Sequence, residues 1–147
     1  MKILVVGAGG VGEAVAAIAR RRGFFEKLVL ADLDADRAAA VASRMGDQRI
    51  SSAAVDASDA AAIAALADAE GCDTILNACD PRFNPPIFEA ASRCGATYLD
   101  MAMTLSEKHP ERPYEECGVK LGDAQFAVAE AWEAKGQLAL VGIGVEP

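Results

Sequence analysis

The sequence predicts an α/β fold of the doubly wound, Rossmann type, with three layers and a mainly parallel sheet of six strands in the order 3-2-1-4-5-6. Three observations support this prediction. Short apolar runs alternate with helical patterns from one end of the chain to the other. Strands joined by helices form right-handed crossovers, which produce a parallel sheet covered by helices on both faces. The chain has 147 residues, the length of one domain with its own core.

Six apolar runs are the predicted strands, and five helical patterns lie between them. The strands are Ile3–Val6, Leu28–Ala31, Ile50–Val55, Thr74–Ala78, Thr97–Leu99 and Leu138–Val141, and the helices cover residues 11–22, 34–45, 58–69, 85–94 and 122–135. The first strand is apolar throughout, which is typical of a central strand buried on both faces. In the first helix Val11, Val15 and Ile18 share one face, and three arginines at 20–22 come near the end where the helix dipole favours cations.

Three segments depart from this alternation. Residues 80–86 form a loop in which Pro85 and Pro86 suit the first turn of the next helix. Residues 101–118 are polar and long for a connection, as functional or mobile loops are. The run 142–147 is rich in glycine and follows a strand directly. We therefore expect the chain to be the first domain of a longer protein.

The composition excludes several classes of function. There are 14 Lys and Arg against 22 Asp and Glu, a formal charge of −8, which disfavours binding to nucleic acid or to an anionic membrane surface. No apolar run approaches the roughly 20 residues that a membrane-spanning helix needs. Glycines and Glu13 interrupt the N-terminal apolar run, so it is no secretion signal, and we expect a cytoplasmic protein. The four cysteines and the single His109 lack metal-ligand spacing, so we expect reduced thiols and no metal site.

The strongest local motif is the glycine-rich sequence at residues 7–12, Gly-Ala-Gly-Gly-Val-Gly, between the first strand and the first helix. Gly7 permits a tight turn, Gly9 lets the backbone approach a pyrophosphate, and Gly12 lets the helix pack closely on the strand. Gly10 and Val11 open the helix, whose N–H groups and positive dipole end suit phosphate. The alternative is a glycine turn that binds no ligand.

An acidic residue follows at the expected distance. Asp32 ends the second strand, 20 residues after Gly12, where a carboxylate can accept both hydroxyls of the adenosine ribose and repel a 2′-phosphate. NAD is therefore predicted over NADP, and Arg37, one helical turn further on, is the residue that could reverse the preference. The alternative role for Asp32 is to cap the second helix, although Asp34 is nearer its start.

Two further strand ends are candidates for cofactor contacts. Asp56 ends the third strand and, with the Ala57 amide, could bind the adenine edge, while a capping role at the next helix is the alternative. The sequence Asn77-Ala78-Cys79 ends the fourth strand, where small residues would line the nicotinamide ribose. Cys79 invites a nucleophile hypothesis, but a small buried side chain is the preferred interpretation because no histidine is close in sequence.

Other polar residues are weaker candidates. His109 is a conceivable base, yet its polar surroundings favour an ordinary loop residue. Asp100 follows the fifth strand and either faces a reaction centre or caps a loop. Met101 and Met103 are assigned to packing. No Ser-His-Asp, paired-glutamate or P-loop arrangement is present, and no catalytic acid or base is assigned.

Several of these segments together resemble the saccharopine dehydrogenase-like oxidoreductases. They are residues 2–12, 31–34, 55–59, 76–81, 98–100 and 142–147, in order along the whole chain. The resemblance implies an N-terminal NAD(P)-binding domain of an enzyme that moves hydride to or from a carbon–nitrogen bond of an amino-acid-derived substrate. Saccharopine reductases, lysine 6-dehydrogenases and carboxynorspermidine synthases are such enzymes.

The same resemblance implies the surroundings of this domain. A second domain after residue 147 would bind an amino-acid or polyamine-precursor substrate, and the full-length protein would be a homodimer. The isolated domain would bind nucleotide without turnover. Carried over residue by residue, the likeness assigns the pyrophosphate to Gly7, Gly9, Gly10, Val11 and Gly12, the ribose to Asp32, the adenine to Asp56 and Ala57, and the nicotinamide side to residues 77–80. A different class remains open, a non-catalytic NAD-sensing domain of an ion-transport system, which has a similar length and glycine motif.

Overall fold

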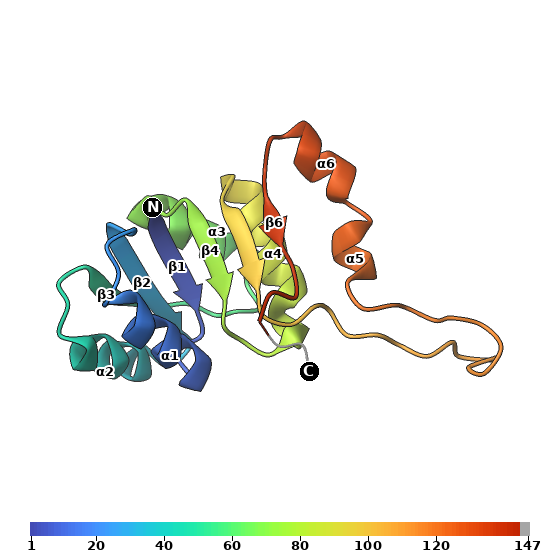
Figure 1. Ribbon diagram of the computed structural model, residues 1–147, viewed down its shortest axis with the longest axis horizontal. Coiled ribbons are helices and arrows are strands. Elements are labelled where there is room, and N and C mark those ends of the chain that lie inside the picture. Colours follow the sequence, from blue (N-terminus) through green and yellow to red (C-terminus); the bar gives the residue numbers. More distant parts are fainter. Residues whose placement is uncertain (145–147) are drawn as a thin grey trace.

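The computed structural model describes residues 1–144 and shows a six-stranded sheet in the order β3-β2-β1-β4-β5-β6, with every paired strand parallel (Figure 1). The strands are β1 (Lys2–Val6), β2 (Lys27–Asp32), β3 (Ile50–Ala54), β4 (Thr74–Asn77), β5 (Thr97–Asp100) and β6 (Ala139–Leu140). The helices are α1 (Gly10–Ala19), α2 (Ala35–Met45), α3 (Ala60–Glu70), α4 (Asn84–Cys94), α5 (Asp123–Phe126) and α6 (Ala129–Ala134), with a 3-10 turn at Pro81–Phe83. The predicted fold class and strand order are confirmed.

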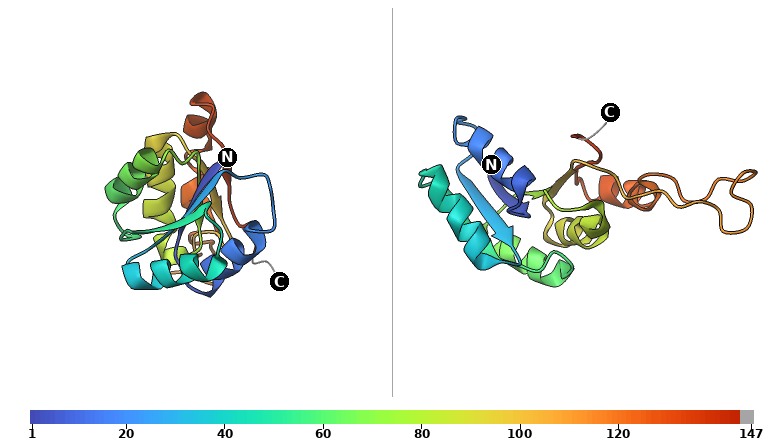
Figure 2. Two further views of the ribbon diagram at one scale, coloured as in Figure 1. Left: turned by 90° about the vertical axis from the view of Figure 1, so that its left-hand side faces the viewer. Right: turned by 90° about the horizontal axis from the view of Figure 1, so that it is seen from below.

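The helices lie in two layers, one on each face of the sheet (Figure 2). Helices α1 and α2 pack on one face through residues such as Ala16, Ala19 and Ala38. Helices α3, α4 and α6 cover the other face, where Ala90 and Trp132 are buried. Because an alanine side chain is short, a helix face rich in alanine can pack closely on the sheet.

Helix boundaries follow local chemistry. The carboxylates of Asp34 and Asp59 accept backbone N–H groups at the starts of α2 and α3. The two adjacent prolines lie in the first turn of α4, as predicted. Helix α1 ends at Ala19, three residues earlier than predicted, because the N–H of Arg22 turns back to the Ala19 carbonyl at 2.7 Å, so the arginines follow the helix. The predicted helix 122–135 is two short helices, separated by a tightened turn at residues 127–128.

One expectation about the layers is wrong. The sheet is not covered on both faces throughout, because no helix of the described residues lies over β4, β5 and β6 on the α1 side (Figure 2). The cause is topological. Right-handed crossovers that run outward from β4 to β6 put their connections, α4 to α6, on the opposite face from α1 and α2.

Residues 101–122, called the arm below, leave the sheet after β5 and project from the body (Figure 1). A single antiparallel bridge between Glu107 and Val119 joins its two sides, and Tyr114 is fully exposed. The long connection predicted from the sequence is confirmed. Among residues 1–144, no helix has the length and apolar character to cross a membrane.

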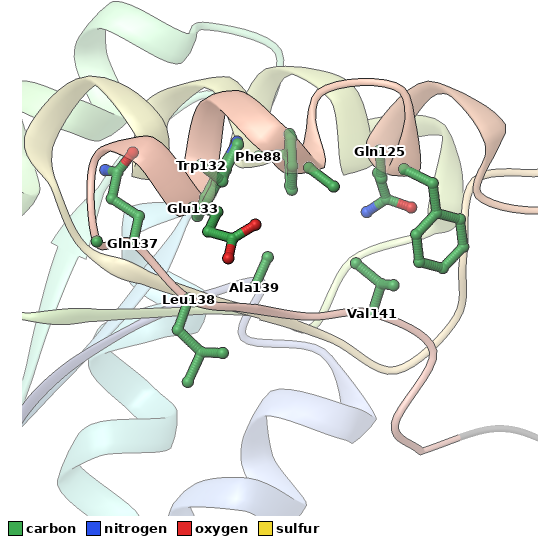
Figure 3. Close-up of a pocket in the computed structure, with 11 residues that line it drawn as sticks. Phe88, Gln125, Trp132, Glu133, Gln137, Leu138, Ala139 and Val141 are labelled. Atoms are coloured by element: carbon green, nitrogen blue, oxygen red, sulfur yellow. The ribbon is translucent and has the colours of Figure 1, made fainter.

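Helix α6 leaves a cavity of about 480 Å³ between itself, α4 and β6 (Figure 3). The rings of Phe88 and Trp132 stack at a centroid distance of 4.5 Å on its wall. Ala139 and Val141 reach this side of the sheet, whereas Leu138 points away from it (Figure 3). The side chains of residues 138–141, in β6 and on either side of it, therefore alternate between two environments, as expected of an extended segment.

Candidate functional site

The glycine-rich loop at residues 7–12 has the geometry that its sequence predicts. Gly7 has φ +104°, and a Cβ there would lie 2.8 Å from the Cys79 Sγ and 3.0 Å from the Ala78 carbonyl oxygen. A Cβ on Gly12 would lie only 1.9 Å from the Gly7 carbonyl oxygen. Gly7 is thus required for the turn and Gly12 for the close approach of α1 to β1.

The N-terminus of α1 is left without a side-chain cap. Gly9 occupies the capping position, and the ten-residue helix begins at Gly10. The helices α2 and α3, by contrast, are capped by Asp34 and Asp59. A Cβ added at Gly9 or Gly10 would meet no atom within 4 Å, so open space lies above the loop. Uncapped N–H groups and the positive dipole end therefore face a space that an anion could fill.

The side chain of Asp32 is fixed beside this loop and is only 11% exposed. One carboxylate oxygen accepts the Ala8 N–H at 2.8 Å, and the other accepts the Asp34 N–H at 3.0 Å. The N-cap of α2 is Asp34, which accepts the Arg37 N–H, so the capping alternative for Asp32 is wrong. Asp32 lies where the predicted ribose contact requires a carboxylate.

A cation accompanies this carboxylate. The Nη1 of Arg37 lies 3.4 Å from Asp32 Oδ1, and its Nη2 lies 3.7 Å from Asp34 Oδ2. The Arg37 side chain is 55% exposed, so it can leave these carboxylates at little cost. The position next to the predicted ribose site therefore combines acceptors with an exposed guanidinium.

Asp56 is not the cap of α3. Its Oδ1 accepts from both the N–H and the hydroxyl of Ser58, at 2.8 and 2.7 Å, and these bonds lower the pKa of its carboxyl below the ordinary value. Asp59 caps the helix instead. Asp56 is thus an ionised acceptor at the carboxyl end of β3, and its contact with adenine stays a prediction.

A crevice of about 150 Å³ lies at the carboxyl ends of β1, β2, β3 and β4. It brings together four of the predicted site residues, Gly7, Asp32, Ala57 and Cys79. Leu33 and Phe83 also line it and were not among the predicted site residues. Neither residue belongs to a recognisable binding motif. The sequence feature that could have indicated them is their position shortly after the end of a strand.

The side-chain amide of Asn77 forms its hydrogen bonds with other residues of the chain. Asn77 is buried, its amide donates to the Asn84 Oδ1 at 2.7 Å, and its own oxygen accepts the Cys79 N–H at 2.8 Å. Asn84 in turn donates to the Ala102 carbonyl at 2.7 Å. Asn77 therefore braces the β4 loop that carries Ala78 and Cys79, and the cofactor contacts of these three residues stay a prediction.

The thiol of Cys79 is packed rather than activated. Its Sγ lies 3.3 Å from the Val6 carbonyl oxygen, and burial raises the pKa of the thiol to about 11. At neutral pH it is protonated and a poor nucleophile. The interpretation as a small buried side chain fits this geometry.

The two remaining candidates lie elsewhere. The buried Asp100 accepts the Gln125 amide at 2.7 Å and the Gly142 N–H at 2.6 Å, so it holds two segments together, as its capping alternative predicts. His109 lies in the arm, where Nδ1 accepts the Arg112 N–H and Nε2 faces Glu116. Within residues 1–144 no group of three or more acidic, cysteine or histidine side chains could hold a metal ion.

The packing predicted for Met101 and Met103 is present. A Cβ on Gly144 would touch the Met101 side chain, and one on Gly122 or Gly142 would touch Met103. Part of the terminal segment 142–147 lies outside the described residues, namely 145–147.

Comparisons with known proteins show which sequences this chain resembles. The sequence model described as "Saccharopine dehydrogenase NADP binding domain" matches residues 3–140. A curated relative, carboxyaminopropylagmatine dehydrogenase from Synechocystis, is 27% identical over 99% of this chain and 35% of its own length. This chain therefore spans about a third of that relative.

Solved structures show the same fold. Apo saccharopine dehydrogenase (L-Glu forming) from Saccharomyces cerevisiae superposes with a TM-score of 0.73 at 17% identity, over 99% of this chain and 28% of that one. A metagenomic short-chain oxidoreductase in complex with NADP superposes with a TM-score of 0.66 at 20% identity, over 95% of this chain and 78% of that one.

Proposed function

Because this chain belongs to the saccharopine dehydrogenase NADP-binding domain family, we propose that it is the dinucleotide-binding part of an oxidoreductase. The enzyme would move hydride between NAD and a carbon–nitrogen bond of an amino-acid-derived substrate. One observation carries the proposal: the uncapped N-terminus of α1 opens beside a crevice lined by Gly7, Asp32, Ala57 and Cys79. Ligands of doubly wound sheets bind at such strand ends.

The residues present fit such a cofactor. The N–H groups at Gly9, Gly10 and Val11 would receive the pyrophosphate, because the space above the glycines is open. Asp32 would bind the adenosine ribose, and Asp56 with Ala57 would bind the adenine. The bound nicotinamide supplies the hydride chemistry.

The nicotinamide half would lie against the loop after β4. Ala78 and Cys79 present small side chains there, and the two buried amides of Asn77 and Asn84 fix the backbone. The protonated Cys79 adds no competing nucleophile. The loop therefore orients the ring and takes no part in bond making.

Asp32 supports NAD as the cofactor. A 2′-phosphate would meet its carboxylate, held in place by the Ala8 N–H. Arg37 is the residue that would favour NADP, since its guanidinium lies 3.4 Å from Asp32 and could turn to a phosphate. We propose NAD because two backbone N–H groups, those of Ala8 and Asp34, hold the Asp32 carboxylate, whereas Arg37 is exposed.

The substrate and assembly are part of the proposal. The name of the Synechocystis relative places an agmatine derivative among the substrates of similar dehydrogenases. We propose a small amino-acid or polyamine-precursor substrate bound by a further domain, and a homodimeric whole protein located in the cytoplasm. The support for the further domain is that the Synechocystis dehydrogenase and the yeast saccharopine dehydrogenase are each about three times as long as this chain.

Calorimetry on residues 1–147 tests the cofactor assignment. Loss of a hydrogen-bonded charged contact costs about 1–3 kcal/mol, so Asp32→Ala should weaken NADH binding by about 5- to 150-fold. The control is Asp36→Ala, which removes the same charge from the exposed first turn of α2 and should leave the affinity unchanged. Tighter binding of NADPH than of NADH would overturn the choice of NAD. Absence of binding by both nucleotides would overturn the proposed function.

A further inference from the structure

On the face of the sheet that carries α1, the apolar side chains of β4, β5 and β6 are not covered by a helix of the described residues. These side chains are called the floor. Leu76, Leu99, Leu138 and Leu140 point to this side, and Leu138 and Leu140 are 53% and 40% exposed. On the opposite side of the same strands Tyr98 is fully buried. Strands of parallel sheets are ordinarily buried on both faces. This part of the sheet therefore lacks one layer.

Helix α1 and the turn after it form an apolar wall beside this floor. The helix places its small residues Gly12, Ala16 and Ala19 against the sheet. Ile18 and Phe24 stand at the wall, and each is 59% exposed. Floor and wall enclose a groove of about 590 Å³. An apolar surface of this kind marks a packing site rather than ordinary exposure.

The groove carries positive charge at one end. Among the described residues that line it, Arg22 is the one charged side chain. It lies just beyond the C-terminal end of α1, so one end of the groove is cationic and the rest is apolar. A helix with an apolar face and an acidic end fits both properties.

The crossovers between β4 and β6 cannot provide this helix, because they run on the other face. The chain itself turns to the α1 side after β6. A Cβ on Gly144 would lie 3.0 Å from the Cβ of Met101, the residue that directly follows β5. Figure 2 shows the end of the described chain on the same side of the sheet as α1. In the Synechocystis and yeast dehydrogenases, the polypeptide outside the matched part is about twice as long as this chain.

We propose that, in the whole protein that carries this sequence, an amphipathic helix from the polypeptide beyond β6 lies in this groove. Its apolar face covers Leu99, Leu138 and Leu140, and its acidic or C-terminal end lies next to Arg22. The helix supplies the missing layer and fastens the rest of the protein to the back of α1, the helix whose N-terminus would bind the pyrophosphate.

Carbene footprinting of leucine side chains tests this proposal on the whole natural protein and on residues 1–147. Leu138 and Leu140 should be labelled several-fold less in the whole protein than in residues 1–147. Leu105 is the control, since it is exposed in the arm and outside the groove, and it should be labelled equally in both. A second measurement uses Leu138→Glu, which should lower the melting temperature of the whole protein and leave that of residues 1–147 unchanged. Leu105→Glu should change neither.

Two results would overturn the proposal. Equal labelling of Leu138 and Leu140 in both proteins would mean that no segment covers the groove. Protection in residues 1–147 alone that grows with protein concentration would assign the groove to a second copy of the chain. Neither outcome bears on nucleotide binding, so this test and the calorimetric test fail independently.

Discussion

Replacing Gly12 by alanine tests the close approach of α1 to the turn at Gly7, and Gly10→Ala is its matched control. Both glycines belong to α1, and neither has a positive φ. A Cβ at position 12 would lie 1.9 Å from the Gly7 carbonyl oxygen, whereas a Cβ at position 10 would meet nothing within 4 Å. The two substitutions therefore add the same methyl group to the same helix in opposite steric situations.

The expected magnitudes follow from these distances. Real Cβ atoms stay about 3.0 Å or more from such a neighbour, so the helix or the loop must move by about 1 Å. The obstacle at position 12 is backbone, which cannot rotate away as a side chain can. Overpacking of this kind costs about 1–3 kcal/mol, while Gly10→Ala should stabilise by about 0.4–1 kcal/mol through helix propensity and chain entropy.

Thermal unfolding followed by circular dichroism measures the difference. In a domain of this size 1 kcal/mol corresponds to about 2–4 °C, so Gly12→Ala should melt about 2–12 °C below the wild type, and Gly10→Ala slightly above it. Equal melting temperatures for the two variants would refute the reasoning, because helix propensity alone would then account for both.

Three further predictions concern the rest of the fold. Asp59→Ala should lower the free energy of unfolding by about 0.5–2 kcal/mol because α3 loses its cap, and an unchanged melting temperature would contradict this. Asn84→Ala should cost about 1–3 kcal/mol in urea unfolding, because the buried Asn77 amide loses its acceptor; a cost near zero would show that the brace is dispensable. The hydrogen-bonded Arg49 lowers the pKa of Asp47 from 3.8 to about 2. The ionised Asp47 carboxylate, paired with Arg49, therefore stabilises the folded state above about pH 4, and this contribution is lost as the pH falls toward 2. NMR titration should show this pKa rising in Arg49→Gln, and a wild-type value near 3.8 would count against the pair.

The sequence was sufficient to predict the fold because the deciding signals are local. Apolar runs, glycine after strand one and aspartates before helices each act within a few residues of themselves. The role of Gly12 could be predicted in the same way, since Gly12 lies only five residues after the turn at Gly7. The predicted Asp32 position is also local, because it depends only on the length of one strand–helix–strand unit.

The parts that could not be predicted depend on contacts between distant segments. The Ala8–Asp32 hydrogen bond joins residues 24 apart, and the bond between Asp100 and Gly142 joins residues 42 apart. The run Leu138–Val141 is apolar on both sides, and therefore resembles a doubly buried strand although the structure leaves one side open. The hydrophobic pattern shows which faces of a strand are apolar enough to be buried. The topology of the chain determines whether a helix covers each of those faces.

The root of the arm has a consequence for how this domain can be changed. The Gly122 N–H donates to the Thr104 carbonyl at 3.0 Å, so the chain departs and returns at one point. Insertions beyond that point would add only loop-closure entropy, about 0.6 kcal/mol for each doubling of length. A peptide tag or a foreign binding sequence could therefore be grafted there while the crevice at the strand ends keeps its shape.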